Sequence, residues 1–301
     1  MTKTTTNLLG ILITILAGTY FYITYCSECG AVVKEEPVTE AVITKEPNVT
    51  SYPFAFSDGD YTYSNNDNYN FKIATSSILM PISGKIEEGI TSLKSFLGNN
   101  TSKVINITGY YKSDETNASA FPNLGLARAN SVKNHLVANG ISSTQINTIG
   151  NLRDEMVAKD EIYLGPITYR LDSKAENADD ELQALYEKLK ANPLVFHFNT
   201  AQTSINLNAE QRQKVADISR YLDKVDGASA NVIGYTDNTG NRNTNITLGQ
   251  ERADFGKAYL VRNGISANKI NASSKGPDSP VTTNATEEGR AENRRTVITL
   301  N

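Results

Sequence analysis

The sequence predicts an α/β two-layer sandwich that occurs twice in the chain and is preceded by an N-terminal transmembrane helix. Three observations support this prediction: an uncharged apolar run at residues 7–25, a β-α-β-α-β-β order of segments at residues 194–301, and an internal repeat that relates residues 52–171 to that region. The chain has 301 residues, of which 39% are hydrophobic, which is enough for one membrane helix and two domains with their own cores.

The first predicted element is a transmembrane helix at residues 7–25. At 1.5 Å per residue, this run without a charged side chain spans the hydrocarbon core of a bilayer. Aromatic residues typical of a membrane interface end the run: Tyr20, Phe21, Tyr22 and Tyr25. A cleavable signal peptide has a shorter apolar stretch and a small-residue exit site. We therefore interpret the run as a signal anchor, with residues 1–6 as a cytoplasmic tail and the rest of the chain outside.

Residues 26–51 are predicted to form a flexible tether, because they contain few large apolar side chains and two Glu-Pro pairs. The two cysteines of the chain, Cys26 and Cys29, lie at the start of this stretch. Their Cys-x-x-Cys spacing lacks the strand and helix of a redox site, which leaves a local disulfide, two idle thiols or lipidation of Cys26. Tyr25 precedes Cys26 where lipoprotein processing needs a small residue.

The next predicted element is a connector at residues 172–193. Leu182, Leu185 and Leu189 recur at i, i+3 and i+7, which is typical of an amphipathic helix, and Pro193 ends it.

Alternating strands and helices then follow at residues 194–301. The predicted elements are a strand at 194–198, a helix at 209–222, a strand at 230–234, a helix ending at Asn263, a strand at 269–274 and a strand at 296–300. We place the start of the second helix near Leu248, because Thr247 and Gln250 form a capping-box pattern. This order predicts a mixed sheet with helices on one face.

Residues 52–171 are predicted to be a divergent copy of residues 194–301. Gly109-Tyr110 matches Gly234-Tyr235 at an offset of 125 residues, and three further pairs match at 124. These pairs are Leu124-Gly125 with Leu248-Gly249, Arg128-Ala129 with Arg252-Ala253, and Asn139-Gly-Ile-Ser142 with Asn263-Gly-Ile-Ser266. Lys112 takes the position of Asp237, so we expect this copy to keep the scaffold and to have lost the ligand site.

Composition excludes several classes of function. The net charge is −4 and no basic run occurs, which argues against a nucleic-acid partner. His135 and His197 lie far apart without nearby cysteines, so we expect no metal site. No nucleophile–base pair or pair of acids at a shared crevice can be identified, so we expect no catalytic residues, no cofactor and no enzymatic activity.

Three motifs occur in order near the C-terminus. They are Gly234-Tyr-Thr-Asp-Asn-Thr-Gly240, Leu248-Gly-Gln-Glu-Arg-Ala253 and Gly289-Arg-Ala-Glu-Asn-Arg-Arg295. A strand–loop–helix crossover can bring Asp237, in the loop, and Arg252, in the helix, to one crevice. The arginine fork binds a carboxylate bidentately, and we expect the helix start near Leu248 to offer unpaired N–H groups as well.

These motifs closely resemble the OmpA-like peptidoglycan-binding domain family over residues 194–301. The resemblance implies that the domain holds diaminopimelate, a stem-peptide residue whose free end carries one ammonium and one carboxylate. By the same resemblance, the peptidoglycan-binding residues are Asp237, Arg252, Thr236, Asn238, Asn245, Leu248 and Arg294. The chain departs from the family pattern at Tyr235, where histidine is usual, and at Gly249, where serine is usual. The missing serine weakens the expected helix cap unless Thr247 replaces it.

The resemblance implies a non-catalytic protein of the bacterial cell envelope that is anchored in the inner membrane and binds peptidoglycan in the periplasm. The alternative is a stator-like or secretion-complex subunit with the same wall anchor; a stator needs an acid in its membrane helix, and residues 7–25 contain none. The degenerate copy is interpreted as a spacer or as a surface for envelope proteins. The tethered complex and the oligomeric state stay open, as does whether Arg294 lines the site or pairs with a glutamate such as Glu287.

Overall fold

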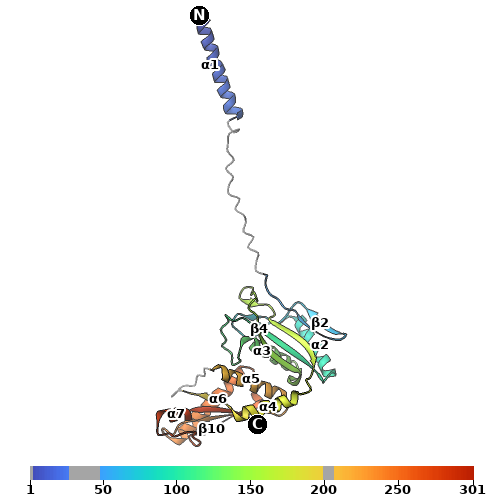
Figure 1. Ribbon diagram of the computed structural model, residues 1–301, viewed down its shortest axis with the longest axis vertical. Coiled ribbons are helices and arrows are strands. Elements are labelled where there is room, and N and C mark those ends of the chain that lie inside the picture. Colours follow the sequence, from blue (N-terminus) through green and yellow to red (C-terminus); the bar gives the residue numbers. More distant parts are fainter. Residues whose placement is uncertain (1–2, 27–47, 199–206) are drawn as a thin grey trace. The chain divides into compact units, whose positions relative to one another are not determined.

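The computed structural model describes residues 3–26, 48–198 and 207–301 (Figure 1). The chain divides into two units, residues 1–47 and residues 48–301. Most of the predicted tether at 26–51 and Cys29 lie outside the described residues, so the tether and the pairing or lipidation of Cys26 and Cys29 stay predictions. The end of the predicted tether is wrong, because the N–H of Thr50 donates to the carbonyl of Val157 at 3.1 Å and so belongs to the second unit.

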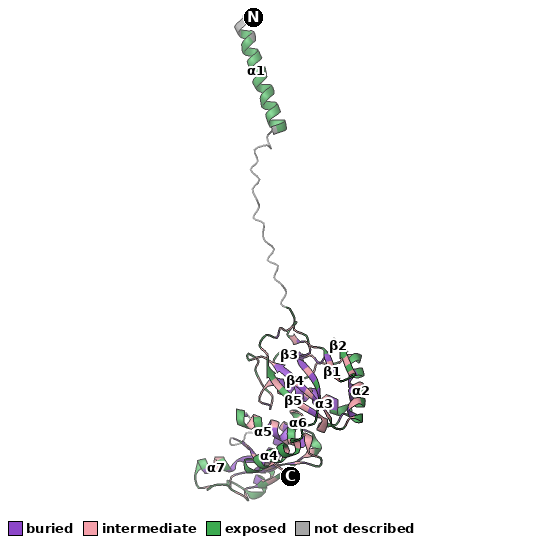
Figure 2. Cartoon of the chain, turned by 45° about the vertical axis from the view of Figure 1, so that its right-hand side comes forward, coloured by how far each residue is buried: buried purple, intermediate pink, exposed green. Residues whose placement is uncertain are grey.

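The first unit contains helix α1 (Lys3–Phe21), which continues into a π-helical turn, η1 (Tyr22–Cys26). Residues Asn7–Tyr25 have a mean hydropathy of 1.7 and none is buried, as the colouring of Figure 2 shows. Within the described part of the chain, this is the one helix long and apolar enough to cross a membrane. The hydroxyl of Thr19 donates to the carbonyl of Ile15 at 2.6 Å, so it needs no water.

The second unit begins at Asn48 and contains the segment that we call the first α/β segment, residues 52–173, which extends two residues beyond the prediction because β7 ends at Ser173. Its elements are β1 (Phe54–Asp58), β2 (Tyr61–Asn65), β3 (Phe71–Lys72), α2 (Gly84–Asn99), β4 (Lys103–Tyr111), α3 (Leu124–Ala138), β5 (Ile146–Leu152), β6 (Ile162–Tyr163) and β7 (Ile167–Ser173). Its main sheet has the order β5-β4-β7, with β4 parallel to β5 and antiparallel to β7. Ile105 and Ile107 of β4, Leu93 of α2 and Val132 of α3 are fully buried in one core.

The second α/β segment, residues 194–301, has its own core and sheet. After α4 (Ala178–Ala191) come β8 (Leu194–His197), α5 (Ala209–Lys224), β9 (Ala230–Tyr235), α6 (Arg242–Arg262), β10 (Ile270–Gly276), α7 (Glu287–Asn293) and β11 (Arg295–Leu300). The sheet order is β10-β9-β11-β8, with β9 parallel to β10 and antiparallel to β11. The strands form a mixed sheet, as predicted, and β9-α6-β10 has the same parallel crossover as β4-α3-β5.

Two predicted features of the second segment are wrong. Helix α6 begins at Arg242, because the side chain of Asn241 caps it by accepting the N–H of Asn243 at 2.8 Å. The hydroxyl of Thr247 instead donates to the carbonyl of Asn243 inside the helix, so Leu248 lies beyond the first turn and its N–H is not a free helix-start donor. The predicted order β-α-β-α-β-β is also wrong, because helix α7 lies between β10 and β11.

Helix α6 lies directly against the end of β9. A Cβ atom added at Gly234 would lie 1.8 Å from the carbonyl oxygen of Gly249, so the two backbones are in contact. The first segment has the same approach, since a Cβ at Gly109 would lie 2.1 Å from the oxygen of Gly125. Gly249 therefore serves strand–helix contact inside α6 and has no part in a helix cap, which corrects the expectation drawn from its position.

The two segments also meet through charged and polar groups. Lys133 of α3 pairs with Asp223 of α5. Lys224 donates to the carbonyls of Thr144 at 2.8 Å and Ile146 at 2.7 Å. Because these side chains come from both segments, protonation at this junction affects how the segments hold together.

We expect replacement of Gly234 by alanine to lower the free energy of unfolding by about 1–3 kcal/mol, because the new methyl group collides with backbone that cannot move independently. The matched control is Gly98→Ala in α2, where nothing lies within 4 Å of the added Cβ. That change should stabilise the chain by about 0.5–1 kcal/mol through helix propensity. Denaturant unfolding measures both, and equal effects at the two sites would contradict the strand–helix contact.

A second prediction concerns pH. Burial, together with the positive charges of Arg220, Lys133 and Lys174 and against the opposing charge of Asp223, lowers the pKa of Lys224 from 10.5 to about 8. Between these values the unfolded chain binds the proton and the native chain does not, so stability rises with pH. From pH 8 to about 9.5, the free energy of unfolding should rise by about 1–2 kcal/mol more in the wild type than in Lys224→Gln. Parallel pH curves for the two proteins would show that the amine is not perturbed.

Candidate functional site

The loop after β9 places one carboxylate in a partly enclosed position. The side chain of Asp237 is 13% exposed. One oxygen accepts the backbone N–H of Thr239 at 2.9 Å, and the other accepts Nη1 of Arg294 at 3.0 Å. Burial by itself raises the pKa of Asp237, but the hydrogen bonds from Thr239 and Arg294 and the charge of Arg294 outweigh it, so the pKa is lowered. The carboxylate is therefore ionised at neutral pH.

Arg294, at the end of α7, connects this carboxylate to a second one. Its Nη2 donates to Glu287 at 2.9 Å while Nη1 holds Asp237. Burial alone would lower the pKa of Arg294, but its hydrogen bonds to Asp237 and Glu287 and their negative charges raise the pKa by more. The pKa of Arg294 is therefore above the usual arginine value. Arg294 thus pairs with a glutamate, as one alternative held, and the same guanidinium also binds Asp237; whether it lines a ligand site stays a prediction.

Arg252, on α6, supplies the second guanidinium of the site and is almost fully buried, with 1% exposure. Its Nη1 donates to the carbonyl of Tyr235 at 3.2 Å, and its guanidinium carbon lies 5.4 Å from the ring centre of Phe198. Its Nε has no hydrogen-bond partner. Burial lowers the pKa of Arg252, the charge of Arg294 lowers it further, and the charge of Asp237 opposes both. Among the described residues, no carboxylate forms an ion pair with Arg252.

Three formal charges therefore interact at this place: Asp237, Arg252 and Arg294. The sequence suggested that Asp237 and Arg252 share a crevice, and their electrostatic coupling is consistent with that placement. The direct ion-pair partner of Asp237, however, is Arg294. Arg294 is paired with both Asp237 and Glu287, so Arg252 is the guanidinium of this group that has no carboxylate partner among the described residues.

The remaining predicted site residues surround the loop in different ways. Thr236 is buried, and its hydroxyl donates to the carbonyl of Asp237 at 2.8 Å. Asn245 is buried on α6, where its amide donates to the carbonyls of Asp237 at 3.3 Å and Thr239 at 3.0 Å. These two residues fix the loop that carries the acid, whereas Asn238 is exposed and Leu248 is half-buried.

Sequence reasoning named Glu287 as one possible partner of Arg294 but did not assign Asn293 its structural role. Glu287 forms ion pairs with both Arg290, at 2.8 Å, and Arg294. Asn293 is completely buried and accepts the N–H of Val281 at 2.8 Å, which fixes the chain ahead of α7. The seven-residue spacing of Glu287 and Arg294 equals about two helical turns. It indicates an ion pair only if α7 is a helix, which the sequence analysis did not predict.

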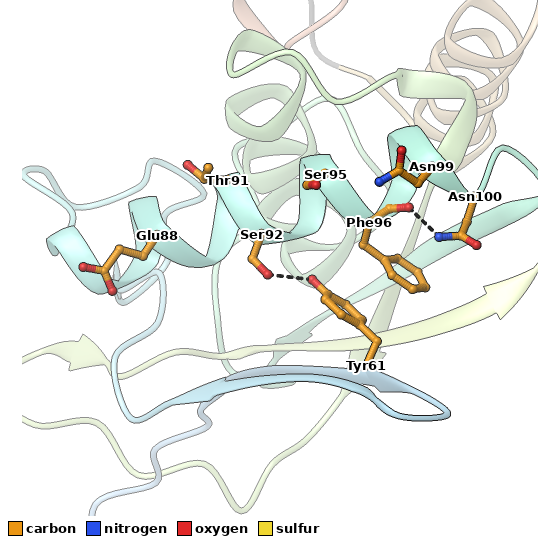
Figure 3. A pocket seen from close by; sticks show the side chains of 8 residues that line it. All are labelled: Tyr61, Glu88, Thr91, Ser92, Ser95, Phe96, Asn99 and Asn100. Atoms are coloured by element: carbon orange, nitrogen blue, oxygen red, sulfur yellow. Dashed lines mark hydrogen bonds between the residues drawn. The ribbon is translucent and has the colours of Figure 1, made fainter.

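A hollow of about 550 Å³ lies far from this chemistry, on the first segment between β2 and α2 (Figure 3). The ring of Tyr61 stacks on Phe96 with 4.1 Å between centres, and its hydroxyl shares a hydrogen bond of 2.9 Å with Ser92. These polar and aromatic groups already contact one another, and no residues of opposite charge line the hollow together. Over the described ranges, no group of three or more histidine, cysteine, aspartate or glutamate residues could hold a metal ion.

We expect the change Arg294→Gln to raise the pKa of Asp237, because the carboxylate then loses a charge-assisted hydrogen bond while staying partly buried. Arg242→Gln is the matched control, since Arg242 pairs with the exposed Asp278 in the same segment. The pKa is measured from the carboxyl carbon shift of Asp237 in an NMR titration. The same pKa in both variants would show that Arg294 does not act on Asp237 in solution.

Comparisons with known proteins show which family the chain resembles. The sequence model described as "OmpA family" matches residues 71–162 and 196–294, which together make up more than half of the chain. The "Probable lipoprotein YiaD" of Escherichia coli K12 is 37% identical over 98 residues, which cover 33% of this chain and 45% of that protein. The "Peptidoglycan-associated lipoprotein" of Buchnera aphidicola subsp. Baizongia pistaciae is 33% identical over 122 residues, covering 40% and 68%. The "Peptidoglycan-binding protein ArfA" of Mycobacterium tuberculosis is 36% identical over 121 residues, covering 40% and 36%.

Two solved structures are also similar. The crystal structure of the peptidoglycan-associated lipoprotein from Burkholderia pseudomallei is 24% identical, covers 36% of this chain and 89% of that one, and has a TM-score of 0.32. The C-terminal domain of MotB from Helicobacter pylori is 27% identical, covers 36% and 84%, and has a TM-score of 0.31. The chain spans less than half the length of YiaD and ArfA. On the extent of the family match, the chain belongs to the OmpA family.

Proposed function

We propose that residues 194–301 bind peptidoglycan without catalysing a reaction and thereby tether a membrane-anchored envelope protein to the cell wall. The ligand in this proposal is the zwitterionic end of a diaminopimelate-type stem peptide. Arg252 receives its carboxylate and Asp237 receives its ammonium. Two relatives are named as a peptidoglycan-binding protein and a peptidoglycan-associated lipoprotein, which supports this class of ligand.

The observation that carries the proposal is the guanidinium of Arg252. It is buried, its Nε has no partner, and no carboxylate pairs with it within the described ranges. A buried charge without a counter-ion is costly. A ligand carboxylate at this guanidinium supplies the missing counter-ion in a bidentate geometry that lysine could not reproduce.

The ammonium of the ligand has a partner in Asp237, although Arg294 now occupies that carboxylate. Arg294 also holds Glu287, so it keeps an ion pair when the ligand takes its place on Asp237. Thr236 and Asn245 keep the loop in position during this exchange, while Asn238 and Leu248 are placed to contact the rest of the peptide.

The first α/β segment, in this proposal, is a divergent duplicate of the same fold that binds no stem peptide. The family match includes residues 71–162 as well as 196–294, and the parallel pairs β4–β5 and β9–β10 support the duplication. Lys112 replaces Asp237 there, so an ammonium group would meet a like charge. The segment is free to act as a spacer or as a surface for envelope proteins.

Helix α1 is proposed as the anchor, in the inner membrane, with the second unit in the periplasm. The uncharged span Asn7–Tyr25, 19 residues long, is long enough to cross a bilayer. The predicted tether, shortened at its end by the contact of Thr50 with Val157, would reach over some tens of ångströms at roughly 3.3 Å per residue. A proton-conducting stator subunit is disfavoured, because residues 7–25 contain no aspartate or glutamate. A secretion-complex subunit would use the same wall contact and differ only in its partners.

The test is co-sedimentation of the full chain, in detergent, with purified sacculi that contain diaminopimelate. Asp237→Asn and Arg252→Lys should each weaken binding by at least about 30-fold, which corresponds to the loss of one partner of a desolvated charge pair, about 2–5 kcal/mol. Arg252→Lys keeps the positive charge but loses the fork. Sacculi with lysine in place of diaminopimelate offer the ammonium without its carboxylate and should bind as weakly as the variants.

The controls are Asp278→Asn and Arg242→Lys, which alter an exposed ion pair of the same segment and should leave binding unchanged. Thermal unfolding verifies that all four variants are folded. Wild-type binding retained by Asp237→Asn and Arg252→Lys would refute the site. Release of soluble muropeptides during the assay would refute a non-catalytic role.

A further inference from the structure

The first α/β segment carries an arginine placed as Arg252 is in the second. Arg128, on α3, is completely buried, and its Nη1 donates to the carbonyl of Tyr110 at 2.8 Å. Arg252 donates from the same atom to the carbonyl of Tyr235, the residue that ends β9. Both guanidinium groups therefore lie beneath the loop that follows the central strand.

Unlike Arg252, Arg128 has an acceptor for its Nε, the carbonyl of Thr75 at 3.0 Å, and it also has a carboxylate partner. The carboxylate of Glu115, whose side chain is 1% exposed, lies on the guanidinium of Arg128. One oxygen accepts Nη2 of Arg128 and the N–H of Ala74, the latter at 2.9 Å. The other accepts Nη1 of Arg128 at 3.0 Å and the N–H of Lys112 at 2.9 Å. Four donors thus converge on two oxygens, two from an arginine fork and two from the backbone.

We propose that the first segment holds a complete carboxylate-binding site, built from Arg128 and the N–H groups of Ala74 and Lys112, whose ligand is the chain's own Glu115. Nothing is left unpaired on this carboxylate, so the site is closed to an external carboxylate. In the second segment, the positions that correspond to Glu115 are Thr239 and Gly240, neither of which is an acid.

Access and space support a receptor of this kind. A hollow of about 340 Å³ adjoins Glu115, and Lys112, Tyr163 and Met156 also line it. Truncation of Glu115 at Cβ keeps the four donors in place. It also creates a space the size of a small monocarboxylate beside this hollow. Free acetate should then take the place of the missing side chain. An ion pair that only stabilises the fold would not be restored by free acetate, so rescue by acetate tests the proposal.

The experiment measures the thermal unfolding of the full chain, in detergent, in sodium acetate and in sodium chloride of equal ionic strength. Glu115→Ala should unfold at a lower temperature than the wild type in chloride and should recover most of the difference in acetate, at concentrations on the order of 10 mM. The wild type should respond equally to the two salts. An equal response of Glu115→Ala to acetate and chloride, or failure of this variant to fold in both, would overturn the proposal.

Glu115→Gln provides an independent arm, because its side chain fills the site without a negative charge. It should unfold well below the wild type, because Arg128 has lost its counter-ion, and acetate should not restore it, because the amide blocks entry. A glutamine variant as stable as the wild type would show that the donors do not require a carboxylate. Acetate rescue of this variant would show that acetate acts elsewhere, which also overturns the proposal. None of these measurements uses peptidoglycan, so their outcome is separate from that of the proposed wall binding.

Discussion

A buried guanidinium beneath the loop that follows the central strand is the interaction on which both α/β segments depend. Such a group cannot lose its proton at physiological pH, so burial demands a counter-charge or hydrogen-bond acceptors. In each segment a strand carbonyl accepts one hydrogen bond from the guanidinium: Tyr110 from Arg128 and Tyr235 from Arg252. The counter-charge is present for Arg128 and is not found for Arg252 among the described residues. The two segments thus represent two electrostatic states of one arrangement.

Close backbone contact makes this arrangement possible. Gly234 and Gly249 let α6 approach β9 until a Cβ on the strand would overlap a helix carbonyl, and Gly109 with Gly125 does the same for α3 and β4. The arginine lies less than one turn after the helix glycine, so its reach to the strand carbonyl depends on this approach. Strand–helix packing and charge burial are therefore coupled.

Much of this could be read from the sequence, and the exceptions have a common cause. The strand–helix–strand order followed from hydrophobic periodicity, and Asp237 and Arg252 followed from their motifs. The helix cap was misplaced because Asn241 and Thr247 both satisfy local capping rules, and only the tertiary path of the loop selects between them. The bond between Asp237 and Arg294 spans 57 residues, so no local pattern reveals it. Glu115 was overlooked because its role depends on backbone donors from Ala74 and Lys112, which the fold brings together.

Two sequence differences between the segments now have one explanation. The loop after the central strand is longer by one residue in the first segment, and Lys112 stands where the second has Asp237. The longer loop allows Glu115 to turn back onto Arg128. An aspartate at position 112 would place a second negative charge beside that carboxylate and would disfavour it. Under the proposed function, a segment that supplies its own carboxylate has no use for an acid that would receive an ammonium, whereas a segment that binds a zwitterion needs one. If the segments are duplicates, as proposed, the absence of the acid and the presence of the glutamate in the first segment are two parts of one difference: its carboxylate comes from the chain itself.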